Sequence, residues 1–163
     1  MHLHRHLPLL AILASTALAK STLTTFEQIQ QTLNTYPLAI DFKNGPLFTS
    51  VFTQDAFANY TGPLSNLTGI DAVREGLLAS VAGLATQHQL GTTLIDIDED
   101  SKEANSTTYF TANLVSVAPE TAGSFTVLFG LYRDDLVETK EGWRISRRQL
   151  EFMTPNLGNL TLG

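Results

Sequence analysis

The first part of the chain carries hydrophobic residues at helical intervals, which indicates one face of an amphipathic helix. These residues are Phe26, Ile29, Leu33 and Tyr36. Thr24 and Glu27 have the spacing of a capping box, which predicts that the helix begins here. Pro37 is expected to kink or end it, and the turn-forming sequence "KNGP" follows Asp41.

Two further helices and a short strand are predicted before residue 85. Pro46 suits a first helical position, so residues 46–52 indicate a short helix, and "DAFANYTG" at 55–62 indicates a brief strand. Thr68 is expected to cap a third helix, with Asp71 three residues later. Its apolar stripe consists of Ile70, Val73, Leu77, Val81 and Leu84.

After Leu84 the hydrophobic period changes to two, which is typical of strands. Strands are predicted over residues 86–97, 104–117, 124–139 and 142–153. In the second of these, one face holds Phe110, Ala112 and Leu114, and the opposite face holds Tyr109, Thr111, Asn113 and Val115.

Helices followed by four antiparallel strands predict an α+β fold in which the helices pack on one face of a sheet. A sheet of long strands over few helices should curl and leave a pocket between its concave face and the helices. Arg147 and Arg148 lie on opposite faces of the last strand, and one of them is expected to pair with Asp134 or Asp135 as a structural contact. The tail, residues 156–163, is predicted to be flexible.

The amino terminus predicts export from the cell. A short start with Arg5 precedes an apolar run, and Ala17 and Ala19 form an A-x-A cleavage site, so residues 1–19 read as a signal peptide. The apolar run is too short for a membrane span, which makes a retained anchor the weaker interpretation. A secreted protein of 144 residues beginning at Lys20 is therefore expected.

Four N-x-[ST] sequons support a secreted glycoprotein, against the alternative that they are accidents of a Thr- and Asn-rich chain. They begin at Asn59, Asn66, Asn105 and Asn159. The first two flank a turn and are the preferred glycosylation sites, because glycans need exposed, loop-like positions.

Composition narrows the classes of partner and cofactor. The chain has no cysteine, and the mature chain would contain one histidine, His88, so a metal site is not expected. Without the leader, nine basic residues face 16 acidic ones, a net charge of −7 that argues against nucleic acid and membrane surfaces as partners. About 144 residues suffice for one core folded without disulfides. A small neutral or apolar molecule is the favoured partner.

Five segments together resemble the SnoaL-like branch of the nuclear transport factor 2 superfamily. In chain order they are "YPLAIDFKNGPLFTSVFTQDA", "GIDAVREGL", "TQHQLGT", "GLYRDDLVET" and "GWRISRR". The resemblance implies one domain over residues 20–155. Its expected fold is a cone-shaped barrel, with a curved, mainly antiparallel sheet of four to six strands around an internal pocket. Family members include polyketide cyclases and scytalone dehydratase, and many form homodimers through the sheet.

The resemblance also implies site residues. Asp41 matches a pocket aspartate, Tyr60 a tyrosine that holds a water or substrate oxygen, and His88 a pocket histidine. Two departures count against scytalone as the substrate. Ile40 stands where scytalone dehydratase has a tyrosine, and the second histidine of that enzyme has no counterpart after His88, where Asn113 and Ser116 are the nearby polar candidates.

Asp41, His88 and Tyr60 would suffice for acid–base chemistry without a cofactor. A neutral imidazole removes a proton beside a carbonyl, a carboxylate orients it, and a tyrosine hydroxyl binds the developing oxyanion. The alternative roles are purely structural: a core histidine for His88, a helix-end cap for Asp41 and a packing side chain for Tyr60. Four further residues are expected to line the pocket and contact a substrate: Tyr109, Asn113, Tyr132 and Trp143.

Two functions remain open at this stage. The first is a lyase, cyclase or isomerase acting on a polyketide-like molecule of secondary metabolism. The second is a non-catalytic secreted glycoprotein that binds or carries a small apolar ligand in the same pocket. Export favours the second, and the set of Asp41, His88 and Tyr60 favours the first.

Overall fold

The computed structural model describes residues 23–160, and the predicted signal peptide lies outside this range. Two α-helices are described, α1 (Thr25–Asp41) and α2 (Ile70–Ser80), with short 3₁₀ helices at Gly45–Ser50, Gly62–Leu64 and Pro119–Thr121. The strands are β1 (Phe52–Asn59), β2 (Leu67–Thr68), β3 (Leu84–Asp98), β4 (Glu103–Ser116), β5 (Phe125–Thr139), β6 (Gly142–Phe152) and β7 (Leu157–Gly158). Between residues 23 and 160, no helix is long and apolar enough to span a bilayer.

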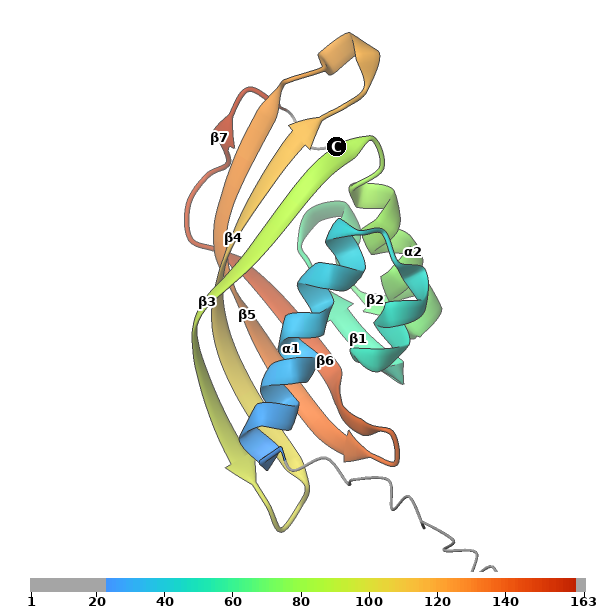
Figure 1. The fold of residues 1–163 in the computed structure, drawn as a ribbon, viewed down its shortest axis with the longest axis vertical. Coiled ribbons are helices and arrows are strands. Elements are labelled where there is room, and N and C mark those ends of the chain that lie inside the picture. Colours follow the sequence, from blue (N-terminus) through green and yellow to red (C-terminus); the bar gives the residue numbers. More distant parts are fainter. Residues whose placement is uncertain (1–22, 161–163) are drawn as a thin grey trace, which may run out of the picture.

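The strands form one curved sheet in the order β2-β1-β6-β5-β4-β3, with β7 paired to β5. Neighbouring strands are antiparallel except β1 and β6, which run parallel. Both helices lie on the concave side of the sheet (Figure 1). The predicted α+β class and cone-shaped fold are therefore confirmed, with two short strands, β2 and β7, that the hydrophobic pattern did not indicate.

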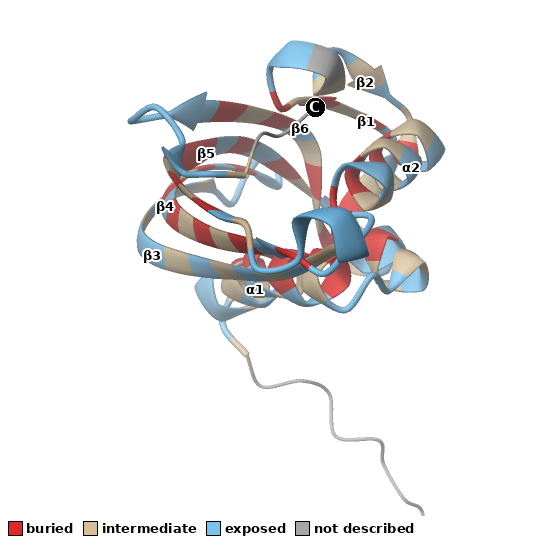
Figure 2. Ribbon diagram, turned by 90° about the horizontal axis from the view of Figure 1, so that it is seen from above, coloured by how far each residue is buried: buried red, intermediate tan, exposed pale blue. Residues whose placement is uncertain are grey.

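The alternation of β4 decides which side chains can reach the interior. Phe110 and Leu114 are each 4% exposed, whereas Tyr109 is 47% and Val115 39% exposed. Figure 2 shows buried residues alternating with less buried ones along the strands of the sheet. The two predicted faces of this strand are thus confirmed, because successive side chains of a strand point to opposite faces.

Helix α1 begins as predicted and ends later than predicted. Thr24 caps the helix, and its backbone N–H in turn donates to the Glu27 carboxylate at 2.8 Å, which completes the capping box. Pro37 was predicted to kink or end the helix, and it does not end it: the helix runs through Pro37 to Asp41. Proline removes one backbone hydrogen bond, and burial of the last turn, including Tyr36 and Ile40, offsets that loss.

Helix α2 also begins differently from the prediction. Its N-cap is Gly69, at φ 85°, and no side chain caps it, whereas Thr68 lies in β2 opposite Phe57. Glycine adopts this positive φ without a steric penalty, so it allows the sharp change of direction from strand to helix. The helix buries Ile70, Val73 and Leu77 of the predicted stripe, whereas Val81 follows its last residue and Leu84 begins β3.

The carboxy-terminal segment contains ordered contacts where the sequence predicted a flexible tail. Residues 157–158 form β7, which pairs with β5 at Val127 and Thr126. The backbone amides of Asn159 and Leu160 both donate to the Phe125 carbonyl at 2.9 Å. The segment occupies the edge of β5 beyond the point where β6 ends, because an unpaired strand edge offers free hydrogen-bonding groups.

Candidate functional site

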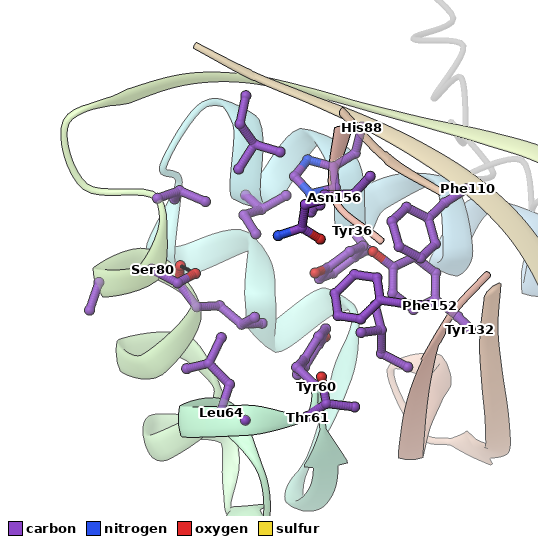
Figure 3. Close-up of a pocket in the computed structure, with 18 residues that line it drawn as sticks. Tyr36, Tyr60, Thr61, Leu64, Ser80, His88, Phe110, Tyr132, Phe152 and Asn156 are labelled. Atoms are coloured by element: carbon purple, nitrogen blue, oxygen red, sulfur yellow. Dashed lines mark hydrogen bonds between the residues drawn. The ribbon is translucent and has the colours of Figure 1, made fainter. Parts of the chain in front are cut away.

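A cavity of about 450 Å³ lies between the concave face of the sheet and the helices. Its walls are mostly apolar, and they include Ile40, Leu77, Phe110, Leu128, Leu150 and Phe152. The polar side chains are few, and they include His88, Tyr36, Tyr60, Tyr132, Ser80 and Asn156 (Figure 3). A largely apolar cavity with a few convergent polar groups is typical of a binding site for a small organic molecule.

His88 and Asp41 meet at the edge of this cavity. His88 lies in β3 opposite Ala112, which places it on the concave face, and Asp41 is the last residue of α1. The His88 Nδ1 and Asp41 Oδ1 atoms are 2.7 Å apart. The continuation of α1 past Pro37 is what brings the carboxylate to the histidine.

Two further hydrogen bonds hold the Asp41 carboxylate. The His88 backbone N–H donates to Oδ2 and the Thr86 hydroxyl donates to Oδ1, each at 2.8 Å. Burial raises the pKa of Asp41, but the hydrogen bonds and the charge of His88 outweigh burial, so the pKa lies below its usual range. Asp41 is therefore an anion at neutral pH.

An ionised Asp41 determines which nitrogen of His88 carries the proton. Because a carboxylate can only accept, Nδ1 must donate to it, and in the neutral ring Nε2 is then an acceptor. Nε2 has no hydrogen-bond partner in the described part of the chain, and the His88 side chain lines the cavity at 8% exposure. The arrangement presents an oriented base to whatever the cavity binds.

Three tyrosines form one wall of the cavity, which we call the tyrosine wall: Tyr36, Tyr60 and Tyr132. The Tyr36 ring lies 6.4 Å from the Tyr60 ring, 5.6 Å from the Tyr132 ring and 6.3 Å from the His88 ring, between ring centres. The Tyr60 hydroxyl is buried and has no hydrogen-bond partner within residues 23–160. Burial raises the pKa of all three phenols, so each remains protonated and can donate a hydrogen bond.

The predicted pairing of an arginine of β6 with Asp134 or Asp135 is confirmed for Arg148. Its Nε and Nη2 atoms donate to the two carboxylate oxygens of Asp134, each at 2.7 Å. The side chains are 1% and 0% exposed. Arg147, on the opposite face, is exposed and lies over the Phe57 ring at 4.8 Å.

The structure places four of the seven predicted catalytic and binding residues together and three elsewhere. Asp41, His88, Tyr60 and Tyr132 lie at the cavity. Tyr109 and Asn113 belong to the convex face of β4, because alternation separates them from Phe110 and Ala112. Trp143 is 3% exposed and packs in the core without lining the cavity. The interpretation of these three residues as wall residues was wrong.

The cavity-lining residues that sequence reasoning missed include Tyr36, Phe152 and Asn156. Tyr36 belongs to the apolar stripe of α1, and helical periodicity does not distinguish a side chain that lines a cavity from one in a filled core. Phe152 ends β6, and Asn156 lies in the segment before β7. For Asn156 no pattern in the sequence indicated a contact, because the segment around it has no hydrophobic period.

No group of three or more histidine, cysteine or acidic side chains with the geometry to hold a metal ion occurs among the described residues. The imidazole, the carboxylate and the phenols of the site can supply proton transfer and hydrogen bonding. An oriented imidazole next to a wall of protonated phenols can remove a proton from a bound molecule and bind the oxygen on which charge develops.

Comparisons with known proteins extend these observations. Residues 21–149 match the family model of the SnoaL-like domain. A search of curated proteins found no match. The part of the chain that matches the family model includes α1, α2 and all strands that bear the cavity except the end of β6.

Solved structures with the same fold include proteins of different functions. A proposed scytalone dehydratase from Novosphingobium aromaticivorans is 22% identical with a TM-score of 0.71, covering 83% of this chain and 88% of that chain. A hexachlorocyclohexane dehydrochlorinase (LinA, type 2) is 11% identical with a TM-score of 0.72, covering 85% and 90%. Rv3472 from Mycobacterium tuberculosis, a protein of unknown function, is 25% identical with a TM-score of 0.66, covering 78% and 70%.

These neighbours show a shared fold, and fold alone does not decide function. The family match spans most of the chain and agrees with the cone-shaped sheet, the cavity and the order of the elements. The chain therefore belongs to the SnoaL-like domain family, as its sequence resemblance predicted.

Proposed function

We propose that this SnoaL-like protein is a cofactor-independent lyase, cyclase or isomerase that acts on a small polyketide-like molecule. The observation that carries the proposal is the 2.7 Å contact between His88 and Asp41 at the edge of an apolar cavity. A packing histidine would not need an ionised carboxylate that is itself held by three hydrogen bonds. An orienting carboxylate with a free second ring nitrogen is the arrangement that general-base catalysis requires.

The proposed mechanism moves one proton through His88. Nε2 takes the proton from a carbon next to a carbonyl, and the electron pair of the broken C–H bond forms an enolate whose oxygen carries the charge. Asp41 stabilises the imidazolium that results, and the Tyr60 hydroxyl donates to the enolate oxygen. His88 then returns the proton, either to carbon in an isomerisation or to a departing oxygen in an elimination.

A second candidate function is supported by the lining of the cavity. Most of its wall is apolar, so a secreted protein of this kind could bind or carry a small apolar ligand without changing it. The two functions differ in what they require of His88. A carrier needs the shape of the side chain at this position, and a catalyst needs its free nitrogen.

Hydrogen exchange on a simple ketone tests the proposal without knowledge of the natural substrate. We expect the protein to accelerate exchange of the carbon-bound hydrogens of 2-tetralone in D₂O, followed by NMR. His88→Gln should reduce the rate by about 10²–10⁴-fold, the usual contribution of acid–base assistance. Gln89→Ala, on the opposite face of β3, is the matched control.

The outcome also separates the two functions. Binding of 2-tetralone with no accelerated exchange at any pH would reject the catalyst in favour of the carrier. Equal exchange rates for His88→Gln and the wild type would show that another group is the base.

We propose further that the protein is exported and glycosylated. The signal-peptide pattern and four sequons support this proposal, and Asn66, Asn105 and Asn159 are exposed. Asn59 is partly buried and accepts a hydrogen bond from the Thr61 amide at 2.9 Å, so Asn66 is the stronger candidate of the first two. Amino-terminal sequencing should begin at Lys20, and glycosidase treatment should lower the mass. A secreted product at the bare polypeptide mass would reject the glycans.

A homodimer through the sheet remains part of the proposal. Tyr109, Val115 and Phe125 are 47%, 39% and 47% exposed on the convex face, which supports an apolar contact there. Asn105 lies on the same face of β4, so a glycan on it would confine any contact to the other end of the strand. Light scattering before and after deglycosylation should give about twice the monomer mass in both states. A monomer in both would remove the dimer and leave the site unaffected.

A further inference from the structure

Arg148 lies directly behind the tyrosine wall, between two of its rings. The guanidinium carbon is 4.2 Å from the centre of the Tyr132 ring and 4.3 Å from that of the Tyr36 ring. Asp134 occupies the Nε and Nη2 atoms, whereas Nη1 is buried with no hydrogen-bond partner among the described residues. The ion pair is thus a dipole whose positive end, Nη1, is turned away from Asp134.

The Arg148 Nη1 group and the Tyr60 hydroxyl, neither of which makes another hydrogen bond among the described residues, lie close together, and the side-chain contact with Arg148 acts to lower the pKa of Tyr60 against the effect of burial. Arginine can only donate hydrogen bonds, and a buried donor without an acceptor is unfavourable. Tyr60 lines the cavity and Arg148 does not, so Tyr60 is the group through which the positive charge can act on a bound molecule. An acceptor oxygen in the cavity would complete this arrangement.

The charge of Arg148 influences each phenol of the tyrosine wall. Burial raises the pKa of Tyr36, Tyr60 and Tyr132, and the positive charge of Arg148 acts in the opposite direction on all three. A nearby cation polarises the O–H bond of a phenol, so the phenol becomes a stronger hydrogen-bond donor. The phenols remain protonated because burial dominates.

Stability alone is a weak explanation for this ion pair. Transfer of two charges from water to the core is unfavourable, and apolar replacements of a buried ion pair are often neutral or stabilising. The pair lies directly behind a cavity wall and points its unpaired end away from its own carboxylate. This placement suits a role in the site.

We propose that Arg148 is a positioning residue that polarises the tyrosine wall, and that the wall binds the negatively charged oxygen of an enolate or phenolate. The inference rests on the proposed function, in which removal of a proton by His88 leaves charge on the substrate oxygen. It specifies the ligand as a ring-bearing ketone, enol or phenol, since the remaining wall is apolar and aromatic. In Figure 3, Tyr36, Tyr60, Tyr132 and His88 surround the same space, which allows one ligand to contact both groups.

The experiment compares naphthalene with 2-naphthol and a more acidic derivative, 6-cyano-2-naphthol, by equilibrium dialysis. Naphthalene measures the apolar cavity, and the naphthols add one oxygen of increasing negative character. We expect wild-type affinity to rise in this order. In the double variant Arg148→Met/Asp134→Asn, which removes both charges, the preference for 6-cyano-2-naphthol over naphthalene should fall roughly tenfold, with naphthalene affinity retained.

Three variants act as controls. Arg147→Met removes an exposed arginine on the opposite face of β6 and should keep the full preference. Arg148→Lys retains the positive charge, so it should keep part of the preference for 6-cyano-2-naphthol that the double variant loses. A merely structural role would not predict this result. Tyr60→Phe removes the hydroxyl through which Arg148 acts and should lower the preference as the double variant does. If the double variant fails to fold, Tyr60→Phe and Arg148→Lys decide the question.

An unchanged preference in both the double variant and Tyr60→Phe would overturn the inference, as would a wild type that binds the naphthols no better than naphthalene. If His88→Gln were the only variant to lose the preference for the naphthols over naphthalene, the ligand oxygen would lie at the histidine. That result would also overturn the inference. The proposed function is tested separately by exchange of 2-tetralone, so its failure would leave a measured oxygen preference of the tyrosine wall intact, and the reverse also holds.

Discussion

Two carboxylates of this protein each bind a nitrogen base at 2.7 Å, but they do so in different surroundings. Asp134 and Arg148 are 0% and 1% exposed and belong to neighbouring strands of the sheet. Asp41 and His88 are 16% and 8% exposed and join the end of α1 to β3 at the cavity. The first pair is sealed by aromatic rings, whereas the second borders the space that a ligand would occupy.

The difference assigns different tasks to the two pairs. Arginine keeps its proton at any pH that a protein experiences, so the Asp134–Arg148 pair provides a constant electric field. An imidazole can both accept and release a proton, so the Asp41–His88 pair can transfer one. A cavity with a fixed field on one side and a movable proton on the other can separate charge in a bound molecule.

Breaking the sealed pair should produce the largest change in stability. Arg148→Ala leaves Asp134 as a buried, unpaired charge and removes a side chain packed between two tyrosine rings. We expect the free energy of unfolding to fall by about 3–5 kcal/mol, measured by urea denaturation. Arg147→Ala, the exposed neighbour, should change it by less than about 1 kcal/mol. Equal losses in the two variants would show that the sealed pair is no more important than a surface contact.

The parts of this contrast that could be predicted from sequence are those that depend on local patterns. Period-two alternation predicted the two faces of β4 and the opposite orientations of Arg147 and Arg148. The capping box at Thr24 predicted the start of α1. Applied consistently, the same alternation would have rejected Tyr109 as a wall residue, since it predicted that Tyr109 and Phe110 face opposite sides.

The remaining parts depend on contacts between distant segments. The continuation of α1 through Pro37 depends on the burial of Tyr36 and Ile40 against the rest of the fold, which outweighs the local effect of proline. Trp143 is buried near the start of β6, whereas Leu150 and Phe152, which line the cavity, lie at the other end of that strand beyond an irregularity in its pairing with β5. Asn156 reaches the cavity because β7 fixes the end of its segment to β5.

Removing the carboxylate of the second pair should have a smaller effect, and the effect should depend on pH. The pKa of Asp41 is lower in the folded protein than its unfolded value of about 3.9. Its contribution to stability is therefore complete above that value and is lost as the pH falls through the folded pKa. Asp41→Asn should lower the free energy of unfolding by about 2 kcal/mol at pH 7, with a difference that shrinks below about pH 4.

The exposed carboxylate Asp55 supplies the comparison, because Asp55→Asn should leave the free energy of unfolding nearly unchanged between pH 3 and pH 7, to within roughly 0.5 kcal/mol. Urea denaturation at several pH values measures both variants. A constant difference between Asp41→Asn and the wild type down to the lowest pH would show that the carboxylate gains nothing from ionisation in the folded protein.

The Tyr60 hydroxyl in the tyrosine wall should have a smaller effect on stability than either pair. Tyr60 is 7% exposed, and its hydroxyl is buried without a partner among residues 23–160. Tyr60→Phe removes an unsatisfied polar group and keeps the ring, so the free energy of unfolding should stay constant or rise by up to about 1 kcal/mol. Tyr109→Phe, whose hydroxyl belongs to an exposed side chain on the convex face, should change it by still less. Thermal and urea denaturation of the two variants side by side provides the measurement.

A loss of more than about 1 kcal/mol in Tyr60→Phe would mean that the folded protein satisfies this hydroxyl without a ligand. In that case Tyr60 would not be a free donor for a substrate oxygen, and Arg148 could not act on a bound molecule through it.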